Sequence, residues 1–135
     1  MPESIRDRDK QAVRVEDQRP RADAVILTVE GEADLHVAPE LRDRLAAAVD
    51  EGATLVVVDL SETTIVDSVT LGALMAAMKR LRARRGQLRL VVGRREVRRT
   101  FEVALVDRIF PLYGSREEAL AAAANGREPS RPGPG

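Results

Sequence analysis

The six residues Leu55–Leu60 constrain the fold more than any other stretch of the chain. They read Leu-Val-Val-Val-Asp-Leu, an apolar and mostly β-branched run that is typical of a strand covered on both faces of a sheet. A helical apolar period takes over from Leu71, and a short polar segment lies between the two patterns. The chain must therefore fold around a buried strand that leads, through a polar connection, into a helix.

Strand and helix patterns alternate along the rest of the chain, after two strand patterns that suit a hairpin. Strands are predicted over about 12–16, 24–32, 54–60, 88–93 and 108–113, helices over about 39–51, 68–85, 95–105 and 115–125, and polar connections through Pro20 and through 60–68. This alternation predicts an α/β fold, a mixed β-sheet of about five strands with about four α-helices and right-handed crossovers. Function in such sheets collects beyond the carboxyl ends of the strands, which here means the loops 31–38 and 60–68.

One domain accounts for the 135 residues, with residues 11–124 as its folded part. Residues 1–10 are charged and nearly free of apolar side chains, so we expect a flexible N-terminal tail, and the composition of residues 125–135 predicts a disordered C-terminal tail. No apolar signal segment opens the sequence, and no run approaches the ~18 apolar residues of a membrane-spanning helix. We therefore expect a soluble, cytoplasmic protein that binds no membrane.

The composition excludes several kinds of site. The chain has no cysteine, which excludes disulfides and thiolate metal sites, and its single histidine is His36. The acids of the two loops match no calcium-binding spacing, so we predict solvated carboxylates, no metal and no cofactor. Aromatic residues make up only 2% of the chain, which leaves little for base stacking or an aromatic ligand cage.

The charges are polarised along the sequence although the formal net charge is zero. Ten acids between Glu30 and Asp67 face only two bases, whereas ten bases between Lys79 and Arg99 face only one acid. A basic run of this kind suggests contact with nucleic acid. The low aromatic content and the neutral total charge argue against a dedicated binder, so we predict no direct nucleic-acid partner.

Ser68 stands where the second helix must begin. Its side-chain oxygen suits an N-cap, which accepts a hydrogen bond from the free N–H groups of the first turn. The same helix end stabilises an anion, so a phosphate on Ser68 could be held without unfolding the helix. A nucleophilic serine needs an activating base, and no G-x-S-x-G elbow surrounds Ser68, so we predict that the protein is not an enzyme.

Three separated parts of the chain carry a family resemblance: Gly31–Leu35 with Ala38–Leu41, Val56–Gly72, and Gly86–Gly93. In order and spacing they resemble the STAS domain of bacterial anti-sigma factor antagonists. The resemblance spans about residues 11–124. It implies a single STAS-like α/β domain.

The resemblance also implies partner switching, a form of transcription regulation. An unphosphorylated antagonist binds an anti-sigma factor of the histidine-kinase-like ATPase type and so frees a sigma factor. The same partner phosphorylates the serine after the aspartate, which breaks the complex, and a PP2C-type phosphatase restores it. By position, Ser68 is the phosphorylated serine, and the predicted partner-binding residues are Asp34, His36, Asp67, Ser68, Val69, Thr70 and Gly72.

Val69 and Thr70 depart from the family pattern, which has a small hydroxyl residue and then glycine at these positions. The β-branched Thr70 is expected to hinder the close approach of a kinase, or to be a second phosphate acceptor, although filling the first helical turn is the commoner role. An alternative stays open, in which the domain is a non-phosphorylated STAS scaffold or interaction module in a sensory or lipid-transport complex. Ser68 then only caps a helix.

Overall fold

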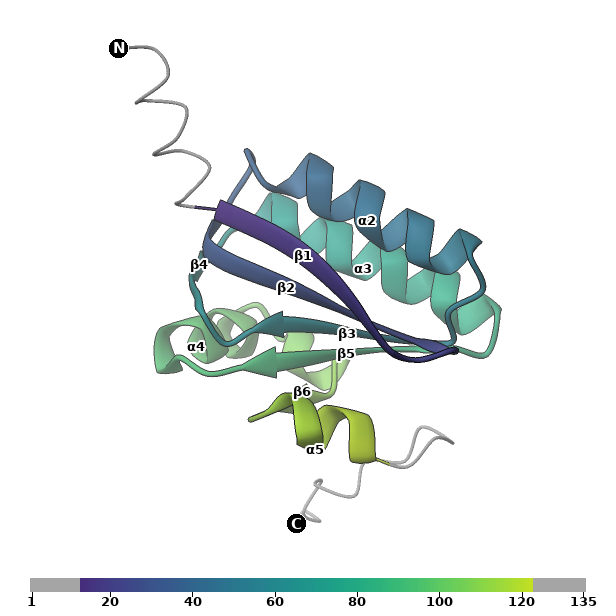
Figure 1. Ribbon diagram of the computed structural model, residues 1–135. Helices are drawn as coiled ribbons and strands as arrows, with labels where there is room; N and C mark the ends of the chain where they lie inside the picture. The colour runs from purple at the N-terminus through teal and green to yellow at the C-terminus, as the bar shows by residue number, and fades with distance from the viewer. Residues whose placement is uncertain (1–12, 123–135) are drawn as a thin grey trace.

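Within the residues that the structure describes, the chain forms six strands and four α-helices. The structure, a computed structural model, describes residues 13–122, and the predicted tails 1–10 and 125–135 lie outside the described residues. Along the chain the elements are β1 (Val13–Arg21), β2 (Ala24–Ala33), α2 (Ala38–Asp50), β3 (Leu55–Leu60), β4 (Thr63–Val66), α3 (Ser68–Ala83), β5 (Gln87–Val92), α4 (Arg95–Val103), the short 3-10 helix η1 (Val106–Arg108), β6 (Leu112–Tyr113) and α5 (Arg116–Ala121). The strands form one mixed sheet in the order β1-β2-β3-β5-β6, with β4 paired to β2 (Figure 1). The α/β prediction is confirmed, with one strand more than expected.

The buried strand β3 lies at the centre of this sheet. It pairs in parallel with β2 on one side and with β5 on the other, and all six of its residues are buried. Val56, Val58 and Leu60 belong to one apolar core, whereas Leu55 and Val57 belong to a second core on the opposite face. The alternating side chains of one strand therefore fill two cores, as the continuous apolar run predicts.

The two cores are covered unequally. Helices α2, α3 and α4 supply side chains to the larger core, where Leu45, Leu81 and Phe101 are almost fully buried. The opposite face is covered among the described helices by the short α5, through Ala119 and its neighbours (Figure 1). This second, thinner layer depends on polar contacts as well as on apolar packing.

The first two strands form the predicted antiparallel hairpin, from the pair Val13 and Gly31 to the pair Arg21 and Ala24. The predicted polar connection through Pro20 is wrong, because β1 continues through this proline to Arg21. The register shifts between Gln18 and Arg21, and β1 is an edge strand. A proline lacks the N–H donor of a ladder, and an irregular edge tolerates that loss.

The C-terminal part differs from the prediction in two places. The segment predicted as a strand over 108–113 holds only the two-residue β6, since η1 and a turn occupy its first half. Helix α5 ends at Ala121 rather than near residue 125, because Ala122 has extended backbone angles. Its start is as predicted, with the hydroxyl of Ser115 accepting from the N–H of Glu118.

A buried arginine holds the end of α5 against the sheet. Arg89 of β5 is 1% exposed, and its Nη1 donates to the carbonyl oxygens of Ala119 at 2.6 Å and Ala122 at 3.4 Å. The Nε and Nη2 atoms donate to the side chain of Gln87, and the guanidinium lies 5.9 Å from the centre of the Tyr113 ring. These contacts compensate the cost of burying the charge and place it at the negative end of the helix.

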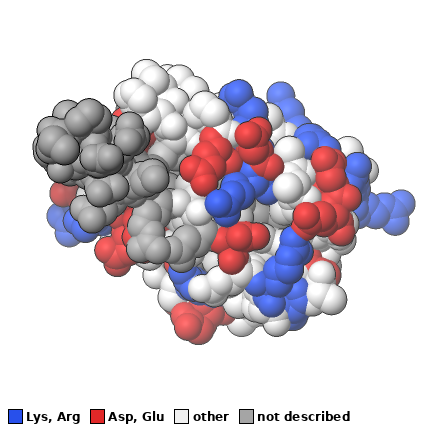
Figure 2. Space-filling model, turned by 45° about the horizontal axis from the view of Figure 1, so that its top comes forward, with Lys and Arg blue, Asp and Glu red and all other residues white. Residues whose placement is uncertain are grey.

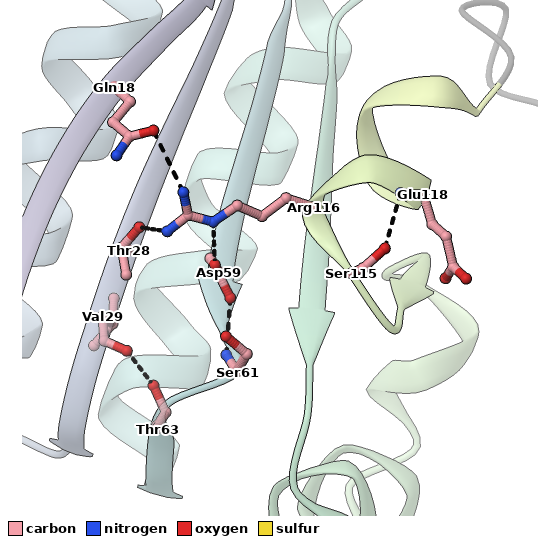
Figure 3. Close-up of polar contacts among 9 residues, drawn as sticks. All are labelled: Gln18, Thr28, Val29, Asp59, Ser61, Thr63, Ser115, Arg116 and Glu118. Atoms are coloured by element: carbon pink, nitrogen blue, oxygen red, sulfur yellow. Dashed lines mark hydrogen bonds and ion pairs between the residues drawn. The ribbon is translucent and has the colours of Figure 1, made fainter.

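A second arginine ties the start of α5 to the middle of the sheet (Figure 3). The Nε atom of Arg116 donates to Asp59, whose side chain is 5% exposed, and its Nη2 donates to the hydroxyl of Thr28 at 2.6 Å. The Nη1 atom reaches Gln18 of the edge strand at 3.3 Å. The other oxygen of Asp59 accepts from the backbone N–H of Ser61 at 2.9 Å, so the network extends to the segment that follows β3.

The carboxylate of Asp59 couples stability to pH. Burial by itself raises the pKa of Asp59, but the hydrogen bonds from Arg116 and Ser61 and the charge of Arg116 outweigh this and hold the pKa below its ordinary value. The folded state therefore binds the proton less tightly than the unfolded chain does. The carboxylate contributes stability above the ordinary aspartate pKa of about 3.9, and this contribution is lost as the pH falls through the lower folded pKa.

We predict that Asp59→Asn lowers the free energy of unfolding at neutral pH by about 1.5–3 kcal/mol, because a charged acceptor is removed from Arg116. The deficit relative to the wild type should shrink as the pH falls below about 4, because the unfolded chain then binds a proton at Asp59 that the folded state binds only at lower pH. Urea unfolding at neutral and acid pH measures this, with the exposed Glu117→Gln as a control. A deficit of equal size at both pH values would contradict the prediction.

Candidate functional site: the Ser68 surface

The connection between β3 and α3 is a strand in part, where the sequence predicted only a polar loop. Residues Thr63–Val66 form β4, which pairs in parallel with the end of β2. The Thr63 hydroxyl is buried and donates to the carbonyl of Val29 at 2.6 Å. Four consecutive β-branched residues were the missed signal.

The two loops predicted to carry function meet at this edge of the sheet. The backbone N–H of Asp67 donates to the carbonyl of Ala33 at 3.1 Å, and the Thr70 hydroxyl donates to the same oxygen at 2.9 Å. Asp34 directly follows Ala33, so the start of α3 is fixed beside the loop after β2. The structure thus brings together the segments that hold Asp34 and Ser68.

Asp67 is the N-cap of α3, and the prediction that Ser68 caps this helix is wrong. The backbone of Asp67 is extended, and its Oδ1 accepts from the N–H of Thr70 at 2.9 Å. Ser68 is the first helical residue, exposed, and its hydroxyl makes no hydrogen bond with the described residues. An aspartate is as good a cap as a serine. The hydroxyl of Ser68 is consequently available to another molecule.

Thr70 and Val69 lie on opposite sides of the first turn. Thr70 is 0% exposed and its hydroxyl is used by the Ala33 carbonyl, whereas Val69 is 43% exposed. This burial removes the reason to expect that Thr70 obstructs an approaching kinase or accepts a phosphate. Thr70 positions the loop of Asp34, and Val69 is the exposed neighbour of Ser68.

Asp34 organises its own loop. Its Oδ1 accepts from the backbone N–H of His36 at 3.0 Å, and its carbonyl accepts from the N–H groups of Val37 and Ala38. The His36 ring is 80% exposed, with Nδ1 at 3.5 Å from Asp34. His36 therefore stands at the rim of the site, bonded to Asp34 and not to Ser68.

Exposed apolar side chains accompany the polar groups at this edge. Leu35 is 58% exposed, Ile65 52% and Val69 43%. Gly72 lies one helical turn beyond Ser68, and a Cβ added there would meet no atom within 4 Å. We call the set Asp34, Leu35, Ile65, Asp67, Ser68, Val69 and Gly72 the Ser68 surface. Its mixture of a free hydroxyl, carboxylates and exposed apolar groups suits contact with a protein.

The described residues offer little for other chemistry. Residues 13–122 contain no group of three His, Cys, Asp or Glu side chains that could hold a metal ion. Nor does this part of the chain contain a helix long and apolar enough to cross a membrane. A hydroxyl without a bonded base is a poor nucleophile.

Comparison with known proteins fits this geometry, since residues 15–119 match the STAS domain family. The chain belongs to the STAS domain family. "Putative anti-sigma factor antagonist BtrV" of Bordetella bronchiseptica is 36% identical over 98 residues, 73% of this chain and 84% of that protein. The sequence-based recognition of the family is thereby confirmed.

Solved structures of STAS proteins have the same fold. The crystal structure of an anti-sigma factor antagonist from Mycobacterium paratuberculosis has a TM-score of 0.74 at 26% identity, over 82% of this chain and 93% of that one. SpoIIAA of Bacillus in its phosphorylated form has a TM-score of 0.64 at 21% identity, over 79% of this chain and 96% of that one. At that identity the second likeness shows the fold alone.

The corrected cap assignment leads to a prediction about two neighbouring residues of this STAS domain. Asp67→Ala should lower the free energy of unfolding by about 1 kcal/mol, because the N–H of Thr70 loses its acceptor. Ser68→Ala should change it by less than about 0.5 kcal/mol, since the hydroxyl is exposed and unbonded. Chemical denaturation of the two variants measures the difference. Destabilisation by Ser68→Ala alone would restore the serine as the cap.

Proposed function

We propose that the chain is a cytoplasmic anti-sigma factor antagonist that binds an anti-sigma factor through the Ser68 surface and is released when Ser68 is phosphorylated. The observation that carries the proposal is the exposed, unbonded hydroxyl of Ser68 at the first turn of α3, between the capping Asp67 and the exposed Val69. The relative BtrV and the match to the STAS family support this class of function. The partner is a histidine-kinase-like ATPase, which phosphorylates Ser68, and a PP2C-type phosphatase removes the phosphate.

A phosphate on Ser68 changes the charge of a site that already holds carboxylates. It adds roughly −1.5 to −2 charges at pH 7 beside Asp67, with Asp34 in the adjoining loop. The unpaired N–H groups of the first turn of α3 stabilise that charge, so the fold itself is retained. If the partner surface over Ser68 is acidic, the phosphate repels it. If that surface is apolar, binding would require the phosphate to lose its hydration. Release follows without any rearrangement of the domain.

The apolar part of the Ser68 surface supplies the binding energy in this proposal. Leu35, Ile65 and Val69 are each about half exposed, and covering them removes apolar surface from water. Gly72 allows the backbone of the partner to approach α3 closely, because the helix has no side chain at this position. The phosphate controls the contact, and the apolar groups make it.

Phosphorylation is tested by incubating the protein with its cognate ATPase-type anti-sigma factor and Mg-ATP and measuring intact mass. We expect one added phosphate on the wild type and on Thr64→Val, whose exposed hydroxyl lies in the neighbouring β4, and none on Ser68→Ala. Ser68→Ala should bind the partner permanently, and Ser68→Glu should lose binding. Phosphate-free wild-type protein, together with unaltered binding by Ser68→Glu, would favour a non-phosphorylated scaffold instead.

Gly72→Ala should separate stability from binding. An exposed glycine in the interior of a helix costs about 0.5–1 kcal/mol relative to alanine, so the substitution should raise the free energy of unfolding by this amount. Binding to the anti-sigma factor should weaken, because the new methyl group enters the contact. Denaturation and isothermal titration on the same preparation measure both effects. A stabilised variant that binds as tightly as the wild type would remove Gly72 from the interface.

A further inference from the structure

The exposed apolar side chains of the described residues fall into two groups of opposite electrostatic character. Leu35, Ile65 and Val69 lie among acids on the Ser68 surface, and the remaining two, Val103 at 72% and Leu105 at 60%, lie at the end of the basic helix α4. The last arginines of the basic run, Arg95, Arg98 and Arg99, are thus part of a second surface, for which the proposed function has no use. We call Arg95, Arg98, Arg99, Val103 and Leu105 the α4 surface.

The arginines of the α4 surface have no partners among residues 13–122. Arg95, Arg98 and Arg99 are spaced to lie together on the helix, away from the buried Val97 and Phe101. None of the three makes a side-chain hydrogen bond or ion pair with the described residues. Their charges are therefore available to an acidic molecule.

Leu105 occupies a position that the fold itself would give to glycine. It follows the end of α4 with a left-handed backbone, φ 64°, which is the conformation where a helix commonly ends on glycine. A leucine is strained in this conformation, because its Cβ comes too close to the neighbouring carbonyl oxygen. The side chain does not compensate this strain by packing in the core, since it is 60% exposed. The exposure of this large apolar side chain makes Leu105 a candidate for contact with another molecule.

Acids with free side chains lie beside the exposed apolar groups of the other surface. Glu32 pairs with Ile65 across β2 and β4, and Glu62 immediately precedes β4; both are exposed and make no ion pair with the described residues. Helix α4 packs against β4 itself. The Ser68 surface with its neighbouring acids and the α4 surface therefore lie at the same end of the molecule.

We propose that this end of the molecule binds a second copy of the chain. A two-fold axis places the α4 surface of each copy on Glu32, Glu62 and Ile65 of the other, so that every acid meets a base and the exposed apolar groups cover one another. A head-to-tail arrangement of two copies would leave the acids of one copy and the arginines of the other uncovered. Of the Ser68 surface, the dimer covers Ile65.

The test measures the mass of the full chain by analytical ultracentrifugation over a wide range of protein concentration at low salt. The wild type should double in mass as its concentration rises, and added salt should weaken the association, because it screens the charge pairs. Arg95→Glu/Arg99→Glu and Glu32→Arg/Glu62→Arg should each stay monomeric. A mixture of the two charge-reversed variants should regain the dimer mass, since acid then meets base at both contacts.

Two further variants keep folding and charge effects apart. Lys79→Glu/Arg85→Glu makes the same change of charge near the C-terminal end of α3 and should dimerise like the wild type. Leu105→Gly removes the exposed side chain and relieves its backbone, so it should be at least as stable as the wild type and yet dimerise less. A wild type that is monomeric throughout, or charge-reversed variants that do not recover on mixing, would overturn the proposal. Neither result decides whether an anti-sigma factor binds, because that binding is measured in a separate experiment with the partner present.

Discussion

The burial of β3 on both faces is the constraint on which the rest of the structure depends. Its side chains enter two cores, so the sheet needs cover on each side. Three helices cover one face, but the six-residue α5 is too short to be stable through apolar contact alone. Arg89 at its end and Arg116 at its start attach it to the sheet instead. Polar side chains thus complete a layer that the hydrophobic effect leaves weak.

The position of Ser68 follows from the same sheet by a short series of contacts. Strand β4 extends β2, and the carbonyl of Ala33 accepts from both Asp67 and Thr70. These bonds fix the first turn of α3 on the rigid edge of the sheet, and Asp67 satisfies the turn with its own carboxylate. The side chain of Ser68 is therefore not needed to hold this turn. A residue with no role in the fold can be modified without loss of the fold.

The sequence patterns predicted the class of fold and the meeting of the two loops, because continuous apolar runs and helical periods depend on burial alone. The boundaries of α2 and β3 were accurate to within a residue. Strand β4 was missed because its polar threonines suited a loop, and only the bond from Thr63 to the carbonyl of Val29 shows why Thr63 is buried. The cap of α3 was misassigned because Asp67 and Ser68 are both good caps, and backbone geometry decides between them.

Gly72 and Leu105 are residues for which the fold alone would favour another side chain. Alanine would suit the helix better than Gly72, and glycine would suit the left-handed turn better than Leu105, yet both positions are exposed and neither choice helps the core. Residues that depart from local preference are expected at functional sites. Gly72 leaves space on the Ser68 surface, and Leu105 projects from the α4 surface. In the two proposals, Gly72 lets an anti-sigma factor approach closely and Leu105 is covered by a second copy of the chain.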